Sequence, residues 1–304
     1  MISSRDSFAA FVEAAYMALN QDDAEFSTAL DLNGIYNRAA DYNPTGCPPK
    51  DVLAGQPLYA AMSAYVDATI PHKIVMQLGW RDLTDVTDTL TVYYDERAAG
   101  RAHVPIVPAD QLPATYLHVY PGAPADADWR IGLNVVPADM ARAMAALAPL
   151  LDEHPDIDHM KFLGPASTDK ADSVIVYLKR NAERYAGLRD AVLAAAAPLT
   201  LQPRVGAMWN EIAPGIGEAS EPPPGYGLSF TSYRCLVVYL AYLSYRHAAA
   251  DRSLADFRLY LAQAMALFGL DPASPHLQGA LAAANPNFAS WWQALVALQE
   301  DWEG

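Results

Sequence analysis

The sequence predicts an α+β fold, in which a twisted, largely antiparallel or mixed β-sheet is flanked by helices and the N- and C-terminal parts are helical. Three observations support this prediction. Apolar residues recur at helical spacing up to about residue 68, short β-branched and aromatic segments begin at His72, and long helical patterns return after about residue 230. A chain of 304 residues with 52% hydrophobic composition can bury a large core. We expect a helical region over residues 1–70 and an α+β domain over residues 71–304.

The N-terminal region is predicted to be helical because its apolar residues follow the period of an α-helix. The first set comprises Phe8, Phe11, Val12, Ala15 and Leu19. A second apolar cluster runs from Leu58 to Val66. The intervening segment DYNPTGCPPKD is rich in Pro and turn-forming residues, which indicates a loop.

The middle of the chain alternates predicted strands with predicted helices. The strand segments are KIVMQLGW, LTVYYDE, TYLHVY, WRIGLNVVP, IDHMKFLGP and SVIVYLKR. One helix is expected from Ala138 to Asp152, which Pro137 can enter at its first turn, and another over residues 182–197. This order predicts a sheet that helices cover on at least one face.

The last part of the chain is predicted to be helical after a loop. The loop is the Pro- and Gly-rich segment APGIGEASEPPPGYG. The following segment, SYRCLVVYLAYLSYRH, is apolar nearly all round, which is typical of a buried helix. Two further helical patterns run over Leu254–Phe268 and Phe288–Trp302.

Charge and hydropathy exclude several classes of partner. The formal net charge of −15 repels polyanions, so we expect neither nucleic acid nor an anionic membrane as a partner. No apolar run reaches the roughly 18 residues that a membrane span needs, and the first residues lack the apolar core of a secretory signal. These features predict a cytoplasmic protein.

We expect neither a metal nor another cofactor. Cys47 and Cys235 are the two cysteines, too few for a disulfide framework or a zinc site, and we expect both to be free thiols. His154 and His159 are five residues apart, a spacing that fits no standard metal site. The Gly-rich nucleotide loops, the zinc-protease motif and the nucleophile elbow are absent.

Positive charge is concentrated in one part of this acidic chain. Three of the five lysines lie within residues 161–179. Lys161 lies between Met160 and Phe162 in a predicted strand, so we expect it on the polar side of the sheet.

Two other predicted strands carry a cation and a polar residue on one face. Arg130 and Asn134 are four residues apart, and Tyr177 and Lys179 are two apart. Taken singly, each cation is better explained as a solvated charge on an exposed face. Side by side on a sheet, however, like charges repel, and an anion would offset that repulsion.

These segments resemble the HopA family of type III effector proteins and, more distantly, the bacterial effector phosphothreonine lyases. A HopA-type domain also occurs in the lyases of class V lanthipeptide and thioamitide biosynthesis. The resemblance covers Trp129 to Tyr245 and rests on three blocks. In the first, WRIGLNVVP is similar to a strand that begins with a phosphate-binding lysine and holds a histidine general acid. Arg130 falls on that lysine, and Gly132 falls on the histidine, a departure from the family pattern.

The other two blocks supply further residues of the family site. Lys161, in DHMKFLGP, falls on the lysine that the family uses as general base. Tyr177 and Lys179 fall on the tyrosine and lysine of the later strand. In SFTSYRC, Tyr233 and Arg234 fall within a Ser-Tyr-Arg triplet whose arginine binds phosphate.

The resemblance implies removal of phosphate from phosphoserine or phosphothreonine by β-elimination, a reaction that needs no metal. Lys161 would take the Cα proton, which requires a lysine pKa lowered from about 10.4 toward neutrality by burial and neighbouring cations. The phosphate would be held by Arg130, Lys179 and Arg234.

With glycine at position 132, the proton for the leaving group would come from another residue. The candidates are His118, on the strand just before the first block, Tyr177 and Tyr233. We expect Asn134 and Tyr233 to contact the substrate.

Two functions follow from the resemblance. The first is a lyase that acts after a partner kinase and converts phosphorylated Ser or Thr of a peptide or protein into a dehydroamino acid, as in lanthipeptide biosynthesis. The alternative is a HopA-like effector or binding module that keeps the fold without chemistry and, as an effector, is secreted into a host cell. Fold likeness alone does not separate them, because function depends on the site.

Overall fold

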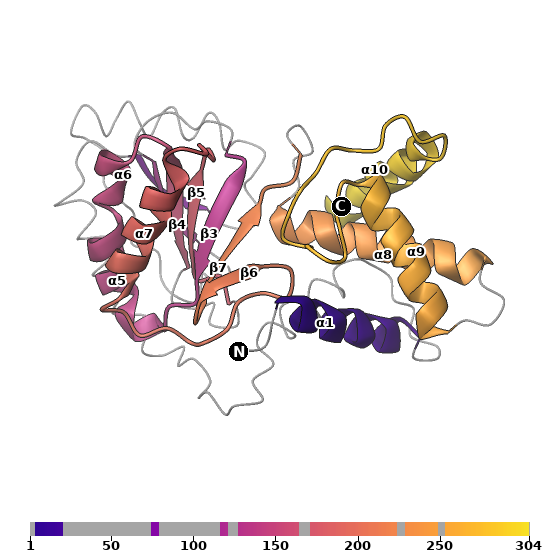
Figure 1. The fold of residues 1–304 in the computed structure, drawn as a ribbon, viewed down its shortest axis with the longest axis horizontal. Helices are drawn as coiled ribbons and strands as arrows, with labels where there is room; N and C mark the ends of the chain where they lie inside the picture. The colour runs from indigo at the N-terminus through magenta and orange to yellow at the C-terminus, as the bar shows by residue number, and fades with distance from the viewer. Residues whose placement is uncertain are drawn as a thin grey trace. The chain divides into compact units, whose positions relative to one another are not determined.

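The computed structural model describes residues 4–20, 74–78, 116–120, 127–163, 171–223, 229–248 and 253–303. The chain divides into two compact units, each described by itself (Figure 1). Unit 1 comprises Met1–Tyr42, Gly206–Glu211 and Glu218–Gly304, and unit 2 comprises Asn43–Val205 and Ile212–Gly217. The predicted loop DYNPTGCPPKD, the Leu58–Val66 cluster and the strand LTVYYDE lie outside the described residues. The expected boundary at residue 70 therefore stays a prediction.

The described strands form one sheet in the order β1-β2-β4-β5-β3-β7-β6. Their bounds are β1 Ile74–Leu78, β2 Tyr116–Tyr120, β3 Trp129–Leu133, β4 Ile157–Leu163, β5 Val174–Leu178, β6 Asn210–Ala213 and β7 Ile216–Ser220. Pairings β1–β2, β2–β4, β4–β5 and β5–β3 are all antiparallel. The predicted α+β fold with a largely antiparallel sheet is thus confirmed.

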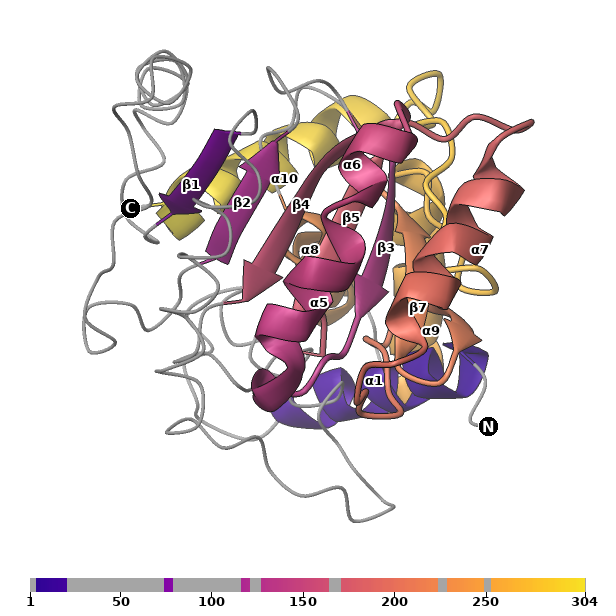
Figure 2. The ribbon, with the colours of Figure 1, turned by 90° about the vertical axis from the view of Figure 1, so that its left-hand side faces the viewer.

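Three helices of unit 2 cover one face of this sheet (Figure 2). They are α5 (Met140–Leu147), α6 (Leu150–Glu153) and α7 (Tyr185–Ala196). Alternate strand residues face them and form one buried apolar cluster with the helices, among them Ile131, Leu133, Met160, Phe162, Val174 and Val176. Because side chains alternate along a strand, the residues between these project to the other face of the sheet.

A β-bulge in β4 keeps the two faces distinct. The pairing of β4 with β5 shifts by one residue between Ile157 and His159, which makes Asp158 the extra residue. In a regular strand Ile157 and His159 would project to the same face. With the bulge, Ile157 packs in the core while His159 lies on the other face, in line with Lys161.

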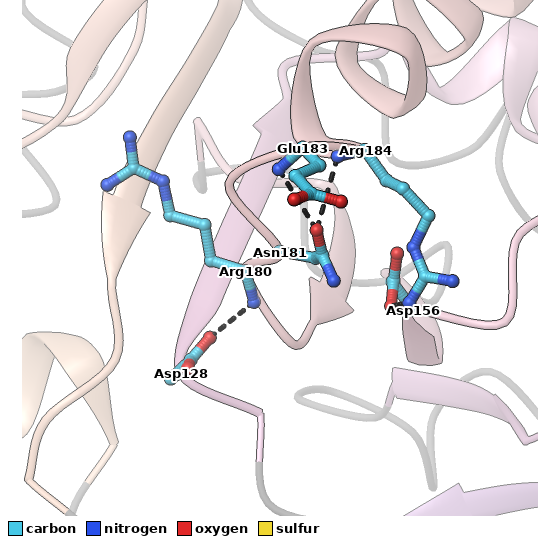
Figure 3. A network of polar contacts seen from close by, with 6 residues as sticks. All are labelled: Asp128, Asp156, Arg180, Asn181, Glu183 and Arg184. Carbon is cyan, nitrogen blue, oxygen red and sulfur yellow. Dashed lines mark hydrogen bonds and ion pairs between the residues drawn. The ribbon is translucent and has the colours of Figure 1, made fainter.

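A turn that the Asn181 side chain stabilises precedes α7. The side-chain oxygen of Asn181 accepts hydrogen bonds from the main-chain N–H groups of Glu183 and Arg184 (Figure 3). Asn side chains that bond the backbone two residues on form a turn, and α7 follows this turn from Tyr185, three residues after the predicted start at residue 182. The guanidinium of Arg184 also contacts the Asp156 carboxylate at 2.6 Å.

The helix predicted from Ala138 to Asp152 is divided into three. A 3₁₀ turn, η3 (Pro137–Asp139), precedes α5, and α6 follows after Pro149. Proline has no N–H to donate to the carbonyl of Ala145, so the α-helical bonding is interrupted there.

The prediction of a single loop over APGIGEASEPPPGYG was wrong, because β7 lies within it. Pro214 and Gly215 form the connection between β6 and β7, and Gly215 has φ 74°. Proline followed by a residue of positive φ is typical of a type II turn. The short, Gly-containing strand gave no alternating pattern from which it could be recognised.

Unit 1 contains the helices at both ends of the chain. They are α1 (Ser4–Leu19), α8 (Phe230–Ala248), α9 (Leu254–Leu267) and α10 (Phe288–Glu303), at or near the predicted positions. The five apolar residues expected on one face of α1 are all buried. The hydroxyl of Tyr242 on α8 donates to the carbonyl of Leu19, and Arg258 on α9 pairs with Glu13 at 2.7 Å. The N-terminal helix thus packs with the C-terminal helices.

No helix in the described ranges combines the length and apolar composition of a membrane span.

Candidate anion-binding site

The candidate site lies on the face of the sheet opposite α5, α6 and α7. Across the adjacent strands β3, β5 and β4, Arg130 pairs with Tyr177 and Tyr177 pairs with His159. In the neighbouring row, Gly132 pairs with Ile175 and Ile175 pairs with Lys161. Directly opposed residues of antiparallel strands project to the same face, so the register gathers these side chains on one surface.

Tyr177 is the centre of a cluster of four side chains, which we call the Tyr177 cluster: Arg130, His159, Lys161 and Tyr177. The guanidinium carbon of Arg130 lies 5.0 Å from the centroid of the Tyr177 ring, and Nζ of Lys161 lies 5.9 Å from it. The imidazole of His159 is stacked on the same ring, with centroids 4.1 Å apart and planes 10° apart. Two basic side chains thus contact one aromatic ring, from the two strands on either side of it.

Burial differs among the members of the Tyr177 cluster. Arg130 is 4% exposed, whereas His159, Lys161 and Tyr177 are half-buried. A guanidinium withdrawn from water is a strong ligand for an oxyanion, because less hydration is lost when the anion binds and the hydrogen bonds are charge-assisted. The half-buried members leave part of the cluster accessible to a ligand.

Asp158 holds the imidazole of His159. Its Oδ2 lies 2.6 Å from Nδ1 of His159, and the side chain of Asp158 is the more buried of the two. An ionised carboxylate only accepts hydrogen bonds, so this contact places a proton on Nδ1. The bulge that makes Asp158 the extra residue of β4 also brings its carboxylate to the ring beside it.

His118 lies next to the expected base rather than next to Gly132. It is the Cα partner of Lys161 in the β2–β4 pair. Position 118 is three strand spacings from Gly132, roughly 14 Å at about 4.8 Å per strand. Neighbouring β1 and β4, β2 is an internal strand of the described sheet.

Lys179 follows the end of β5. Its side chain is exposed, and its Nζ lies 3.4 Å from Oδ2 of Asp128. The main-chain N–H of Lys179 donates to the carbonyl of Asp156, the residue before β4, at 2.8 Å. A role for Lys179 in phosphate binding stays a prediction.

Asn134 is buried just beyond β3. Its amide nitrogen donates to the carbonyl of Arg204 at 3.1 Å, and its main-chain N–H donates to the carbonyl of Gly215 at 2.8 Å. These bonds tie the end of β3 to two other segments of unit 2. Substrate contact by Asn134 remains a prediction.

Arg234 and Tyr233 belong to unit 1 and are fully buried in α8. Arg234 donates from Nε to the carbonyl of Pro275 and from one terminal nitrogen to that of Ser220, and its guanidinium lies 3.8 Å from the centre of the Phe230 ring. The Tyr233 hydroxyl donates to the carbonyl of Phe268 at 2.7 Å. Each side chain therefore has partners within its own unit, and the expected roles in the site stay predictions.

The sequence interpretation missed His159 as a member of the site. It placed His159 in the predicted strand IDHMKFLGP but weighed the residue only as a metal ligand. The available signal was its position two residues before Lys161, which places alternate strand residues on one face. Within the described part of the chain, no group of three or more His, Cys, Asp or Glu side chains could hold a metal ion.

Comparisons with known proteins agree with this fold. The chain is similar to the structure of the effector protein from Pseudomonas syringae pv. tomato strain DC3000, with a TM-score of 0.65 and 18% identity over 91% of this chain and 99% of that one. It is also similar to the effector protein from Pseudomonas syringae pv. syringae strain 61, with a TM-score of 0.62 and 16% identity over 92% and 100% of the two chains.

A comparison with curated protein sequences found no match. The model of the HopA1 effector protein family matches residues 114–277, which include β2 to β7, α8 and α9. The match spans more than half of the chain and contains the whole Tyr177 cluster. The chain therefore belongs to the HopA1 effector protein family.

Proposed function

We propose that this protein binds a phosphorylated Ser or Thr side chain at the Tyr177 cluster and removes its phosphate by β-elimination. The observation that carries the proposal is the convergence of Arg130 and Lys161 on the Tyr177 ring, at 5.0 and 5.9 Å from its centroid. In a chain of net charge −15, two cations on one partly buried surface favour a local anionic ligand.

The cluster offers the groups that β-elimination needs. Arg130 would bind the phosphate through paired, charge-assisted hydrogen bonds. Lys161, on the next strand but one, would remove the Cα proton. The electrons of the C–H bond then form the Cα–Cβ double bond, and those of the Cβ–O bond leave with the phosphate. We further propose that a partner kinase supplies the phosphorylated peptide.

A second candidate function is recognition without chemistry. Position 132, on the same face as Arg130, favours recognition without chemistry. The resemblance implies a histidine general acid there, and the glycine of this chain cannot donate that proton. The two similar structures described above are effector proteins, which fits a module that is secreted into a host cell and binds a protein of that cell.

Mass spectrometry of a phosphothreonine peptide separates the two functions. A lyase produces a peptide that is lighter by one water than the unphosphorylated form, whereas hydrolysis restores the unphosphorylated mass. We expect Lys161→Ala to abolish elimination while changing peptide affinity by no more than several-fold, because a base acts mainly in the transition state.

The comparison with the wild-type protein decides the outcome. If the wild type, supplied with its kinase and the kinase's peptide, binds the phosphopeptide and leaves its mass unchanged, the lyase proposal is wrong and the recognition module remains.

A further inference from the structure

We propose that His159, oriented by Asp158, is the proton donor to the leaving phosphate. This inference rests on the proposed lyase function, in which no residue has yet been assigned to protonate the leaving phosphate. A phosphate monoester dianion that departs with the electrons of the Cβ–O bond would leave as a trianion, so its bridging oxygen needs a proton as the bond breaks. Of the described side chains in the Tyr177 cluster, His159 is the one whose ordinary pKa suits donation near neutral pH.

The position of His159 suits this role. It lies on the same strand as Lys161, two residues earlier, so both project to one face about 7 Å apart along β4. That spacing is of the size needed for a base at Cα and an acid at the oxygen on Cβ. The bulge at Asp158 is what places His159 on this face rather than in the core.

Two contacts fix the orientation of the imidazole. One face of the ring is stacked on Tyr177 at 4.1 Å, and Nδ1 contacts the Asp158 carboxylate at 2.6 Å. The Asp158 side chain is 6% exposed, so little water competes for this bond. Because Nδ1–H donates a hydrogen bond to Asp158, the proton that His159 transfers is the one on Nε2 of the imidazolium.

The step balances without a further reactant. Neutral Lys161 accepts the Cα proton on Nζ, the Cα–Cβ double bond forms, and the Cβ–O bond breaks. The bridging oxygen takes the Nε2 proton, so that hydrogen phosphate leaves. The enzyme is left with protonated Lys161 and neutral His159, and exchange with solvent restores both.

The test compares two leaving groups on one peptide sequence. Phosphoserine needs a proton on the leaving oxygen, whereas O-sulfoserine leaves as sulfate dianion, a weak base that needs none. We expect His159→Asn, which keeps a donor for Asp158, to lower kcat on the phosphoserine peptide about 100-fold or more. On the sulfoserine peptide the loss should be below about fivefold, since only the acid step has been removed.

Matched variants identify the role. Lys161→Ala should lose activity on both peptides, because both need the base. His118→Gln tests the residue across from Lys161, and a loss confined to phosphoserine in that variant assigns the acid to His118 and overturns the inference. His159→Phe keeps an aromatic ring against Tyr177 and should show the same selective loss as His159→Asn. Phosphopeptide affinity, measured for every variant, reports whether the site remains folded.

The assay distinguishes a failure of the role assigned to His159 from a failure of the proposed lyase function. Equal losses on the two peptides in the His159 variants, or no loss on either, would show that His159 is structural while the lyase function stands. If the wild type turns over phosphoserine alone, the readout is rescue of His159→Ala by added imidazole, and absence of rescue overturns the inference. A wild type that eliminates neither group contradicts the proposed function itself.

Discussion

The imidazole of His159 is stacked on the phenol ring of Tyr177, although the two residues come from different strands and are opposed only because β4 carries a bulge. The same ring has Arg130 and Lys161 within contact range. Tyr177 therefore connects the residues to which we assign phosphate binding, proton removal and proton donation.

The first prediction concerns the ring of Tyr177. Tyr177→Ala removes the ring that holds the phosphate ligand Arg130, and at about 1 kcal/mol for that cation–π contact it should weaken phosphopeptide binding about fivefold. Tyr177→Phe keeps the ring and should bind within about threefold of the wild type. Elimination that disappears in Tyr177→Phe despite normal binding would instead identify the hydroxyl as the acid. Calorimetric titration and a rate assay check both variants.

The second prediction separates the two faces of β4. Phe162 is fully buried in the core and Lys161, its neighbour, lies on the site face. Phe162→Ala should destabilise the protein by about 3–5 kcal/mol, whereas Lys161→Ala should change stability by less than about 1 kcal/mol and abolish elimination. Thermal unfolding of the two variants is the measurement. Equal losses of stability would contradict the assignment of faces.

The third prediction uses two glycines of unit 2. Gly215 has φ 74°, and a Cβ there would collide with the carbonyl oxygen of Gln202, so Gly215→Ala should destabilise the protein by at least about 1 kcal/mol. Gly187 lies exposed in α7, where an added Cβ would meet no atom within 4 Å, and Gly187→Ala should stabilise the protein by about 0.5–1 kcal/mol. Opposite shifts of the unfolding temperature are expected. A Gly215→Ala variant as stable as the wild type would contradict the hairpin geometry.

The fourth prediction concerns acid stability. Burial raises the pKa of the Asp139 carboxyl. Hydrogen bonds from the main chain and side chain of Thr200 and from Arg142 together lower this pKa by more than burial raises it, so the net pKa lies below the usual 3.8. A carboxyl whose pKa is lower in the folded state stabilises the fold above its unfolded pKa, and this contribution is lost as pH falls from about 3.8 through the folded pKa.

Asp139→Asn tests this relationship. The variant should be less stable than the wild type at neutral pH, and the difference should shrink as pH falls below about 4. Denaturant titrations at several pH values measure it. A stability difference that stays constant down to about pH 2 would assign the loss to packing rather than to the charge of Asp139.

The sequence predicted the faces of the sheet well because strand alternation is a local property. The placement of Lys161 opposite Met160 and Phe162 depends on three consecutive residues and is confirmed by their burial. The partner of a strand is not local, however. That Tyr177 lies between Arg130 and His159 follows from the order β4-β5-β3, which no single segment encodes.

Other differences have equally specific causes. The bulge at Asp158 changes the face of Ile157 without any Gly or Pro to mark it. The strand β7 is short and contains glycine, so the neighbouring prolines made the whole segment look like a loop. The division of the predicted helix at Pro149 was readable from the sequence, because proline interrupts helical bonding wherever it follows the first turn.

The central claim, that the Tyr177 cluster is a phosphate site, is tested most directly by calorimetric titration of one peptide in phosphorylated and unphosphorylated form. The wild type should bind the phosphopeptide at least about tenfold more tightly. Arg130→Gln should lose that preference, since a charge-assisted hydrogen bond contributes about 1.5–3 kcal/mol, while Arg130→Lys should retain part of it. Arg180→Gln, which removes an exposed cation of the same unit, is the matched control and should bind like the wild type. Equal affinity of the wild type for both peptides, or a preference that survives Arg130→Gln in a folded protein, would contradict the account.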